Sequence, residues 1–202
     1  MKILEENATP NSERVRIFLA EKNINIPFEQ VNSSEADHNF QTFHNIRPFQ
    51  KVPAIILDNG EAISEVSAIC RYLEEVQPEP GLMGEGAPER SRVEMWNKRL
   101  ELYLFDFLYQ QVLSDIPGWA EINRPKAEEA FSVLNEELAT RPYIAGNSFT
   151  LADISAYIAI HALIKLKVSP GKELTHLEKW YMLVAARPGC RISTPEIQKQ
   201  SA

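Results

Sequence analysis

The sequence predicts a two-part protein: a small α/β unit built on a mixed four-stranded sheet, followed by an all-helical bundle. Short apolar strands alternate with helical patterns up to residue 77, whereas every long segment after residue 88 has helical periodicity. Between the two halves, residues 78–88 hold six prolines and glycines, which is typical of a linker. We therefore expect an N-terminal domain over residues 1–77, a linker over 78–88 and an all-helical domain over 89–202.

The N-terminal half contains one strong turn signal. Asp58-Asn59-Gly60 lies between two short apolar runs and predicts a β-hairpin. After the hairpin, apolar residues recur at helical spacing from Val66 to Leu73 and predict a helix with one buried face. In chain order, the expected elements are a strand over 1–5, a helix over 10–22, a strand over 26–31, a loop with an irregular helix over 32–47, strands over 51–57 and 61–63, and a helix opened by Ser64 or Glu65.

The helical half is organised around its most apolar segment. Residues 151–163 are apolar on nearly all sides, which predicts a central, buried helix. The run Thr150-Leu151-Ala152-Asp153 has the pattern of a capping box with Asp in place of Glu, so we assign Asp153 a structural role. The other expected helices cover residues 89–112, 124–139 and 174–186, and residues 189–202 are expected to form a tail.

The composition excludes several classes of function. The chain has 202 residues, a net charge of -7 and no basic cluster, which argues against nucleic acid or an anionic membrane as partner. The longest apolar stretch, residues 156–166, is too short to cross a bilayer, and no signal peptide is expected, because acidic residues interrupt the apolar start. Cys70 and Cys190 form no metal-ligand or CxxC spacing. We therefore expect a cytoplasmic protein without a metal site, in which helix-surface charges such as Glu21 and Lys22 are solvated.

Three short polar side chains, Thr9, Asn11 and Ser12, lie where the first strand ends and the first helix begins. A helix start offers free backbone N–H groups and the positive end of the helix dipole, so it can hold an anion such as a thiolate. The alternative is an ordinary N-cap, with Pro10 in the first helical turn. Taken by itself, the junction leaves both interpretations open.

Four short motifs follow one another along the chain. They are Thr9-Pro10-Asn11 before Arg14-Val15-Arg16-Ile17, the run from Arg47 to Ala54, Ile63-Ser64-Glu65 with the run from Ala68 to Leu73, and the run from Phe149 to Ile154. In this order and spacing they resemble the glutathione S-transferase superfamily, and the resemblance covers essentially the whole chain. The family implies a thioredoxin-like N-terminal domain that binds glutathione, a helical domain that shapes the electrophile site, and usually a homodimer.

The resemblance implies a set of glutathione contacts. Pro53 would follow a cis peptide that turns the backbone of Val52 toward the cysteinyl unit. Glu65 would hold the ammonium of the γ-glutamyl group, and the helix start at Val66 would hold its carboxylate. Family members usually carry Ser where Val66 stands, and here Ser67 comes one position later. The implied glutathione-binding set is His38, Lys51, Val52, Pro53, Glu65, Val66 and Ser67.

The catalytic position differs from that of most family members, which activate the glutathione thiol with Tyr, Ser or Cys near the first junction. The chain has no Tyr before Tyr72, so a tyrosine-type enzyme is excluded unless the residue comes from the second domain. Thr9 occupies the place of the serine in serine-type members, and Thr9-Pro10-Asn11 resembles bacterial nu-class members, which favour disulfide reduction. We expect Thr9, Asn11 and Ser12 to form the catalytic set, with the Thr9 hydroxyl and the Asn11 amide donating hydrogen bonds to the glutathione sulfur.

The first long helix of the helical domain should line the pocket for the second substrate. Tyr103 and Phe107 are the candidates, with Trp119 behind them, although all three are equally compatible with the core. The expected function is that of a glutathione transferase, which uses glutathione as co-substrate to attack a small hydrophobic electrophile. The alternatives are a nu-like, glutathione-dependent disulfide reductase and a non-catalytic binding protein of the same fold.

Overall fold

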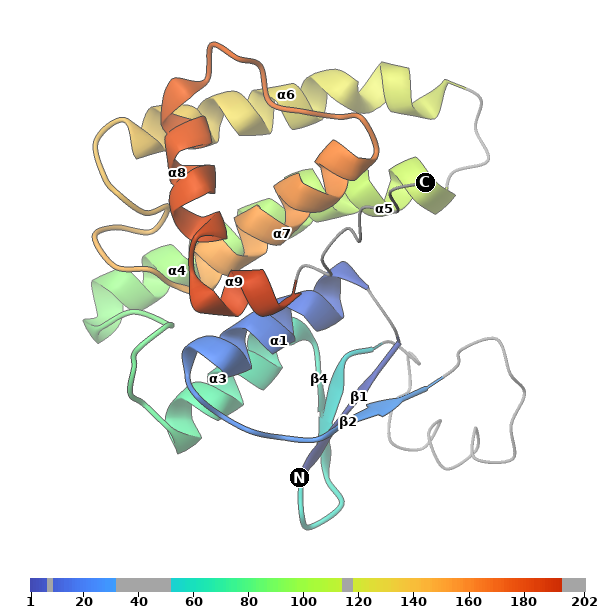
Figure 1. The fold of residues 1–202 in the computed structure, drawn as a ribbon, viewed down its shortest axis with the longest axis vertical. Coiled ribbons are helices and arrows are strands. Elements are labelled where there is room, and N and C mark those ends of the chain that lie inside the picture. Colours follow the sequence, from blue (N-terminus) through green and yellow to red (C-terminus); the bar gives the residue numbers. More distant parts are fainter. Residues whose placement is uncertain (7–8, 32–51, 114–117, 194–202) are drawn as a thin grey trace, which may run out of the picture.

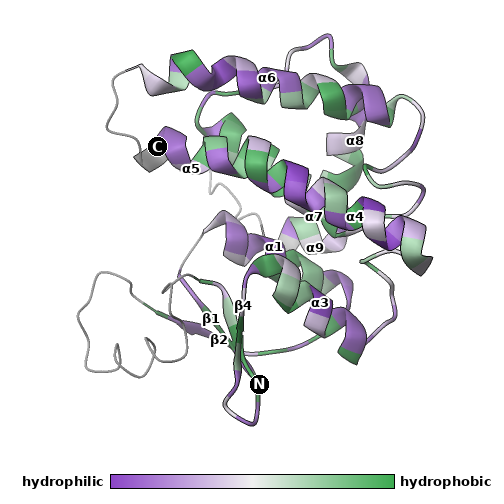
Figure 2. Cartoon of the chain, turned by 180° about the vertical axis from the view of Figure 1, so that it is seen from behind, coloured by the Kyte–Doolittle hydropathy of each residue, from purple (hydrophilic) through white to green (hydrophobic). Residues whose placement is uncertain are grey.

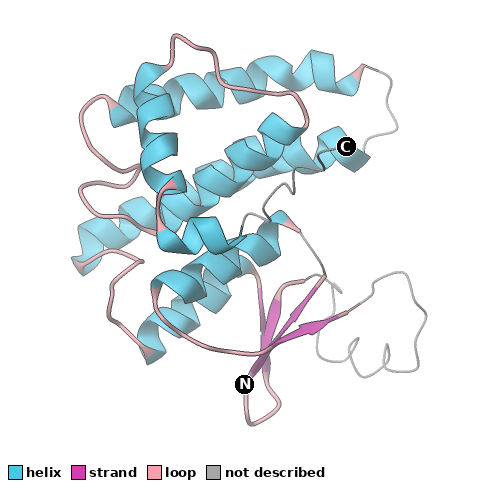
Figure 3. Cartoon of the chain, in the orientation of Figure 1, coloured by secondary structure: helices cyan, strands magenta, loops and turns pink. Residues whose placement is uncertain are grey.

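The computed structural model describes residues 1–6, 9–31, 52–113 and 118–193. The sheet lies at one end of the molecule, and helices make up the rest (Figures 1 and 3). As the sequence predicts, an α/β half with a mixed four-stranded sheet precedes an all-helical half. The elements are β1 (Lys2–Glu5), α1 (Pro10–Glu21), β2 (Phe28–Gln30), β3 (Ala54–Ile56), β4 (Ala62–Ser64), α3 (Val66–Val76), α4 (Gly86–Leu100), the π-helical turn η1 (Glu101–Phe105), α5 (Asp106–Leu113), α6 (Trp119–Leu138), α7 (Leu151–Lys165), α8 (Thr175–Ala185) and α9 (Pro188–Ser193).

The sheet has the order β2-β1-β3-β4, in which β1 is parallel to β2 and the other two pairs are antiparallel. Ile3 pairs with Phe28 on one side and with Ile55 on the other, and both isoleucines are fully buried. The turn between β3 and β4 is the predicted hairpin. Gly60 has a φ of +86°, which glycine adopts without steric cost, and its N–H donates to the Leu57 carbonyl at 3.0 Å.

Helices α1 and α3 lie between the sheet and the helical half (Figure 1). α1 packs against α7 and α9 as well as against α3, so it forms the junction between the two halves. α7 is the predicted central helix, and residues 151–160 are all buried. The outer helices α4 and α6 alternate between hydrophilic and hydrophobic residues, as expected for helices with one solvent-exposed face (Figure 2). In the described part of the chain, neither α7 nor any other helix is long and apolar enough to cross a membrane.

The helix predicted over residues 89–112 is interrupted by the π-helical turn η1. A π-helical turn holds one more residue than an α-helical turn and is frequently found at functional sites. In a regular α-helix, residues eight positions apart, such as Glu101 and Tyr109, point in directions that differ by about 80°. Because η1 takes up one extra residue, the eight residues from Glu101 to Tyr109 turn through about the same angle as seven residues of a regular α-helix. Residues seven positions apart lie on the same face of an α-helix, so Glu101 and Tyr109 point in similar directions.

Several element boundaries differ from the sequence prediction. α6 begins more than one turn earlier than expected, at Trp119, because the helix accommodates Pro125 in its interior. α4 begins at Gly86, inside the predicted linker. The predicted tail contains α9, whose six residues are too few for helical periodicity to reveal. The Arg187 guanidinium, just before α9, donates to the buried carboxylate of Glu21 in α1, so Glu21 is not the solvated residue that we expected.

Lys22, which was also expected to be solvated, is fully buried at the segment that joins the two halves. Its Nζ donates to the Glu74 carboxylate at 2.7 Å and to the carbonyls of Pro78 and Pro80 at 3.2 and 2.7 Å. A buried ammonium group is tolerated only where such partners replace water. Lys22 therefore fixes the start of the linker against α1 and α3.

Candidate active site

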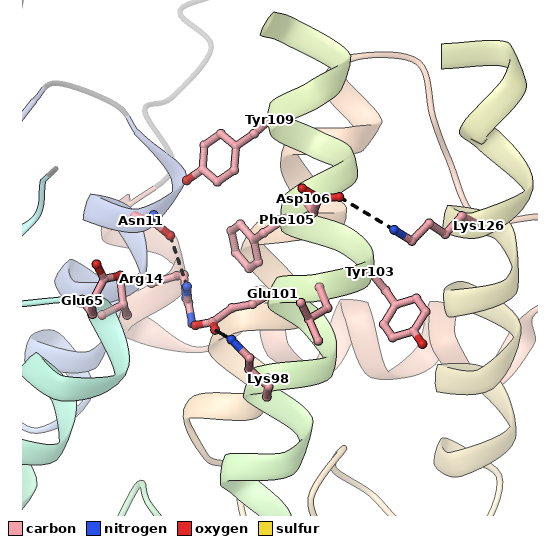
Figure 4. Close-up of a pocket in the computed structure, with 12 residues that line it drawn as sticks. Asn11, Arg14, Glu65, Lys98, Glu101, Tyr103, Phe105, Asp106, Tyr109 and Lys126 are labelled. Carbon is pink, nitrogen blue, oxygen red and sulfur yellow. Dashed lines mark hydrogen bonds and ion pairs between the residues drawn. The ribbon is translucent and has the colours of Figure 1, made fainter. Parts of the chain in front are cut away.

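A cavity of about 610 Å³ lies between the two halves of the molecule, at the start of α1 (Figure 4). This volume is typical of a small-molecule site. Six of its twelve lining residues are charged, yet in the described ranges no three His, Cys, Asp or Glu side chains are grouped as a metal site requires. The lining residues are Asn11, Arg14, Glu65, Val66, Lys98, Glu101, Leu102, Tyr103, Phe105, Asp106, Tyr109 and Lys126.

Of the three predicted catalytic residues, the structure brings only Asn11 to the cavity. Thr9 is the N-cap of α1: its hydroxyl accepts a hydrogen bond from the Ser12 N–H at 3.3 Å and donates to the Ser12 hydroxyl at 2.8 Å. Ser12 is only 1% exposed, so a ligand cannot reach its side chain. The side-chain amide oxygen of Asn11 accepts a hydrogen bond from Arg14 Nη1 at 3.1 Å, which leaves the N–H groups of the Asn11 side-chain amide available to a ligand.

Arg14 is a buried cation beneath the cavity, only 2% exposed. Its Nε donates to the Ser155 hydroxyl at 3.1 Å, and that hydroxyl donates to Asn97 at 2.8 Å. The guanidinium lies 4.6 Å from the centre of the Phe105 ring, and Nη2 lies 3.6 Å from the Glu101 carboxylate. Burial lowers the pKa of Arg14, and Glu101 opposes this shift, so the guanidinium remains charged. Sequence analysis gave Arg14 no role, although its i, i+3 spacing from the candidate site on α1 was a usable signal.

The start of α3 is the second polar corner of the cavity. Glu65 occupies the N-cap position with a φ of +69°, and its carboxylate does not cap the helix. A non-glycine residue in this conformation at a cavity is a recognised pointer to function. Val66, which replaces the usual Ser, is buried against the core, and the Ser67 hydroxyl donates to Glu101 at 3.4 Å instead of lining the cavity. The open N–H groups of this helix start can receive a carboxylate, and Glu65 can receive a cation.

The other predicted glutathione contacts are placed only in part. The Val52–Pro53 peptide is cis, as the resemblance implies, and Pro53 is buried directly before β3. Neither Val52 nor Pro53 is among the residues that line the cavity. His38 and Lys51 lie outside the described residues.

The residues predicted for the second-substrate pocket separate into two groups. Phe107 is 1% exposed and belongs to the core, and its ring centre lies 5.4 Å from that of Trp119, which is half-buried and packs against that core. Neither residue lines the cavity. Tyr103 does line the cavity, but at its outer side, where the Lys126 ammonium lies 5.6 Å from the centre of the tyrosine ring. Beside them, Lys126 and Asp106 form an ion pair at 3.7 Å (Figure 4).

Phe105 and Tyr109 face the inner part of the cavity instead, and sequence analysis missed both. Their ring centres are 6.3 Å apart, and together with Glu101 they form one row along η1 and α5. Burial raises the pKa of the Tyr109 hydroxyl, and the positive charge of Arg14 opposes this rise. The sequence gave no sign of the row, because the periodicity argument continued a regular α-helix through residues 101–105.

The sequence and the fold of this chain match a known family of proteins. Residues 6–81 match the model of the glutathione S-transferase N-terminal domain, and residues 119–188 match the model of the C-terminal domain. The chain is also 32% identical over 207 residues to glutathione S-transferase 2 of Saccharomyces cerevisiae, covering 95% of this chain and 88% of that relative. The chain therefore belongs to the glutathione S-transferase family, whose members are glutathione-dependent transferases.

Three solved structures share the fold of this chain at 30–33% sequence identity. The crystal structure of Gtt2 from Saccharomyces cerevisiae has a TM-score of 0.86 at 30% identity, covering 96% of this chain and 100% of that chain. A glutathione S-transferase of class Gtt2 from Vibrio parahaemolyticus gives 0.85 at 31% identity, covering 96% of each chain. A glutathione S-transferase domain-containing protein from Marinobacter aquaeolei VT8 gives 0.86 at 33% identity, covering 94% of this chain and 100% of that chain.

Proposed function

We propose that the chain binds glutathione between the starts of α1 and α3 and activates its thiol for attack on a small electrophile. One observation carries this proposal: the Asn11 amide, held by Arg14, and the open start of α3 at Glu65 line the same cavity. The first corner suits a thiolate, and the second suits the two charges of a γ-glutamyl group. The length of glutathione between its thiol and its γ-glutamyl end would bridge them.

In the proposed complex, the γ-glutamyl carboxylate accepts hydrogen bonds from the backbone N–H groups at the start of α3. Its ammonium pairs with Glu65, whose carboxylate makes no capping bond to α3. The backbone of Val52, before Pro53, pairs with the cysteinyl unit, as the resemblance implies. Lys51 and His38 complete the proposed set from outside the described residues.

Activation of the thiol requires that charge be stabilised, because neither Asn11 nor Arg14 is a useful base. An Asn11 N–H donates to the sulfur, while the dipole of α1 and the buried charge of Arg14 favour thiolate over thiol. Such surroundings can lower a thiol pKa from about 8.5 to roughly 6 or 7. The proton passes to solvent, the sulfur forms a bond to the electrophilic carbon, and the leaving group departs with the electron pair of the bond that breaks.

The second substrate can be of two kinds. Phe105 and Leu102 give the cavity an apolar strip that suits a small hydrophobic electrophile. A glutathione-dependent disulfide reductase is the second candidate, because charged residues of α4, η1, α5 and α6 also line the cavity and suit a disulfide with charged ends. These charged residues are Lys98, Glu101, Asp106 and Lys126.

Calorimetry with glutathione tests the proposed binding mode. We expect Glu65→Gln to weaken glutathione binding roughly tenfold, because it removes one charge-assisted contact. Glu61→Gln is the matched control, since Glu61 is exposed in the nearby hairpin and does not line the cavity. Failure of the unaltered protein to bind millimolar glutathione would exclude the proposal. If it binds, turnover of an aryl halide against turnover of hydroxyethyl disulfide separates the two enzymatic functions, and binding without turnover of either identifies a non-catalytic binding protein.

The proposal includes a homodimer, because the resemblance to glutathione S-transferases implies one. A groove of about 450 Å³ between α4, η1 and α6 holds the exposed apolar side chains Leu102, Tyr103 and Val133. Burial of these side chains against a second copy would remove apolar surface from water. Sedimentation at micromolar concentration should then give twice the monomer mass, and Val133→Glu, which lies outside the candidate site, should shift the equilibrium toward the monomer.

A further inference from the structure

The helical half contributes a hydroxyl group to the thiol corner of the cavity. Tyr109 lies on α5, and its side chain extends toward the start of α1, where Asn11 lies (Figure 4). Asn11, Arg14 and Tyr109 line the same cavity, although α5 is far from α1 in sequence. The Tyr109 side chain lines the cavity, and among the described residues its hydroxyl has no hydrogen-bond partner.

Among the described residues of the N-terminal half, few side chains offer a donor at this corner. The hydroxyls of Thr9 and Ser12 are bonded to each other, and Ser12 is buried. Asn11 is the only one of the three that reaches the cavity. Hydrogen-bond donors and positive charge around a thiolate stabilise it, so a second donor at this point would lower the pKa of the thiol further.

We propose that the Tyr109 hydroxyl donates a hydrogen bond to the sulfur of bound glutathione and is a catalytic residue of this enzyme. Together with Asn11, Tyr109 would form a pair of donors to the thiolate, one from each half of the molecule. The inference rests on the proposed function, because it requires that glutathione place its thiol at the start of α1.

The protonation state of Tyr109 determines its role. Burial raises the pKa of the hydroxyl, so Tyr109 keeps its proton at neutral pH and acts as a donor instead of a base. Arg14, which opposes this rise, makes the hydroxyl a more acidic and therefore stronger donor. The thiol proton still passes to solvent, and Tyr109 is unchanged at the end of the reaction.

The surrounding structure holds Tyr109 in place. Its ring packs beside Phe105, which in turn lies against the guanidinium of Arg14. The π-helical turn η1 directs Glu101, Phe105 and Tyr109 toward the same cavity, although residues 101 and 109 would diverge by about 80° in a regular α-helix. The hydroxyl therefore reaches the cavity from a rigid helix, which suits a group that must meet a sulfur atom at a fixed position.

Titration of enzyme-bound glutathione, followed by the ultraviolet absorbance of the thiolate, tests the inference with Tyr109→Phe. The variant keeps the ring and removes only the hydroxyl, so its thermal melting should match that of the unaltered protein. We expect the pKa of the bound thiol to rise by about 1 unit and kcat/KM to fall roughly 10- to 30-fold, with glutathione affinity changed less than twofold. Tyr143→Phe is the matched control, because Tyr143 packs against Phe149 away from the cavity and should behave as the unaltered protein.

The outcomes separate this inference from the function on which it rests. If the unaltered protein does not bind glutathione, the proposed function fails. If it binds glutathione and Tyr109→Phe leaves the thiol pKa unchanged, only the role of Tyr109 is overturned. A loss of rate confined to one electrophile, with no change in the thiol pKa, also overturns it, because the hydroxyl would then contact the second substrate and not the sulfur.

Discussion

The starts of α7 and α1 are built in the same way, and yet one serves stability and the other faces the candidate site. Each begins with a threonine N-cap whose hydroxyl lies within hydrogen-bond distance of a polar side chain three residues later: Thr150 with Asp153 at 3.2 Å, and Thr9 with Ser12 at 2.8 Å. The difference lies at the residue before that partner. It is the buried Ala152 in α7 and the cavity-facing asparagine in α1. A helix start becomes a binding site only where a donor is left over after the cap is complete.

At the start of α7 the polar side chain of Asp153 is fully engaged by hydrogen-bond donors. The Asp153 carboxylate accepts hydrogen bonds from the Thr150 N–H at 3.0 Å, the Ile144 N–H at 3.0 Å, Trp180 Nε1 at 2.9 Å and the Thr150 hydroxyl at 3.2 Å. These donors come from the loop before α7, from the cap and from α8, so one buried side chain fixes three segments. The capping box predicted from the sequence is confirmed, with more partners than the local pattern could show.

The largest effect is expected from Asp153→Ala. The change leaves three sets of buried donors without an acceptor, so the free energy of unfolding should fall by about 4 kcal/mol. Activity at low temperature should stay within twofold, because Asp153 does not line the cavity. Urea unfolding of the variant beside Glu178→Ala, an exposed position on α8, measures the difference. Equal stability of the two variants would show that the two helix starts do not differ as proposed.

The pH dependence of stability sharpens the same contrast. Burial raises the pKa of Asp153 from 3.8 to about 6, and the hydrogen bonds to the carboxylate oppose this shift without cancelling it. Because the pKa is higher in the folded state, this group contributes fully to stability below about pH 4, and the contribution is lost as the pH rises through 6. The stability difference between the unaltered protein and Asp153→Ala should therefore shrink by about 2 kcal/mol between about pH 4 and pH 7. A difference that grows with pH would contradict the assignment.

At the start of α1 the expected change is larger in rate than in stability. Asn11→Ala removes a donor to the proposed thiolate, so kcat/KM should fall roughly 10- to 100-fold and the pKa of the bound thiol should rise. The free energy of unfolding should fall by only about 1 kcal/mol, because the cap itself is intact and the loss is confined to the acceptor of Arg14 Nη1. Asn147→Ala, in an exposed loop, is the matched control. An unchanged rate would remove Asn11 from the mechanism.

The features that sequence analysis predicted correctly are local or periodic. The hairpin at Gly60, the cap at Asp153 and the buried faces of the long helices each depend on residues within a few positions of one another. The motifs around Asn11 and Glu65 pointed to two corners of a site, and the structure brings both to one cavity. The resemblance to a family supplied the connection between them, because no local rule relates α1 to α3.

The features that sequence analysis missed depend on contacts across the fold. Sequence analysis gave Arg14 no role and expected Lys22 to be solvated, whereas tertiary packing buries both and provides their partners. Tyr109 was missed because one π-helical turn changes the face of the helix that follows, and hydrophobic periodicity does not register a single extra residue. Glu21 was missed for a related reason, since its partner belongs to α9, a helix too short to predict.

The smallest effect is expected from Thr9→Ala, and this variant tests whether the contrast between the starts of α1 and α7 holds. The resemblance placed Thr9 at the sulfur, whereas the structure uses its hydroxyl to cap α1 and to bond Ser12. Loss of an N-cap of this kind costs about 1 kcal/mol, so the free energy of unfolding should fall by that amount, while kcat/KM should stay within about threefold of the unaltered value. Thr9→Ser, which keeps the hydroxyl, should restore the stability. If turnover instead falls as far as in Asn11→Ala while the variant remains as stable as the unaltered protein, Thr9 contacts the sulfur directly. The cap of α1 would then be part of the site, and the distinction between a completed cap and a leftover donor would not hold for this helix.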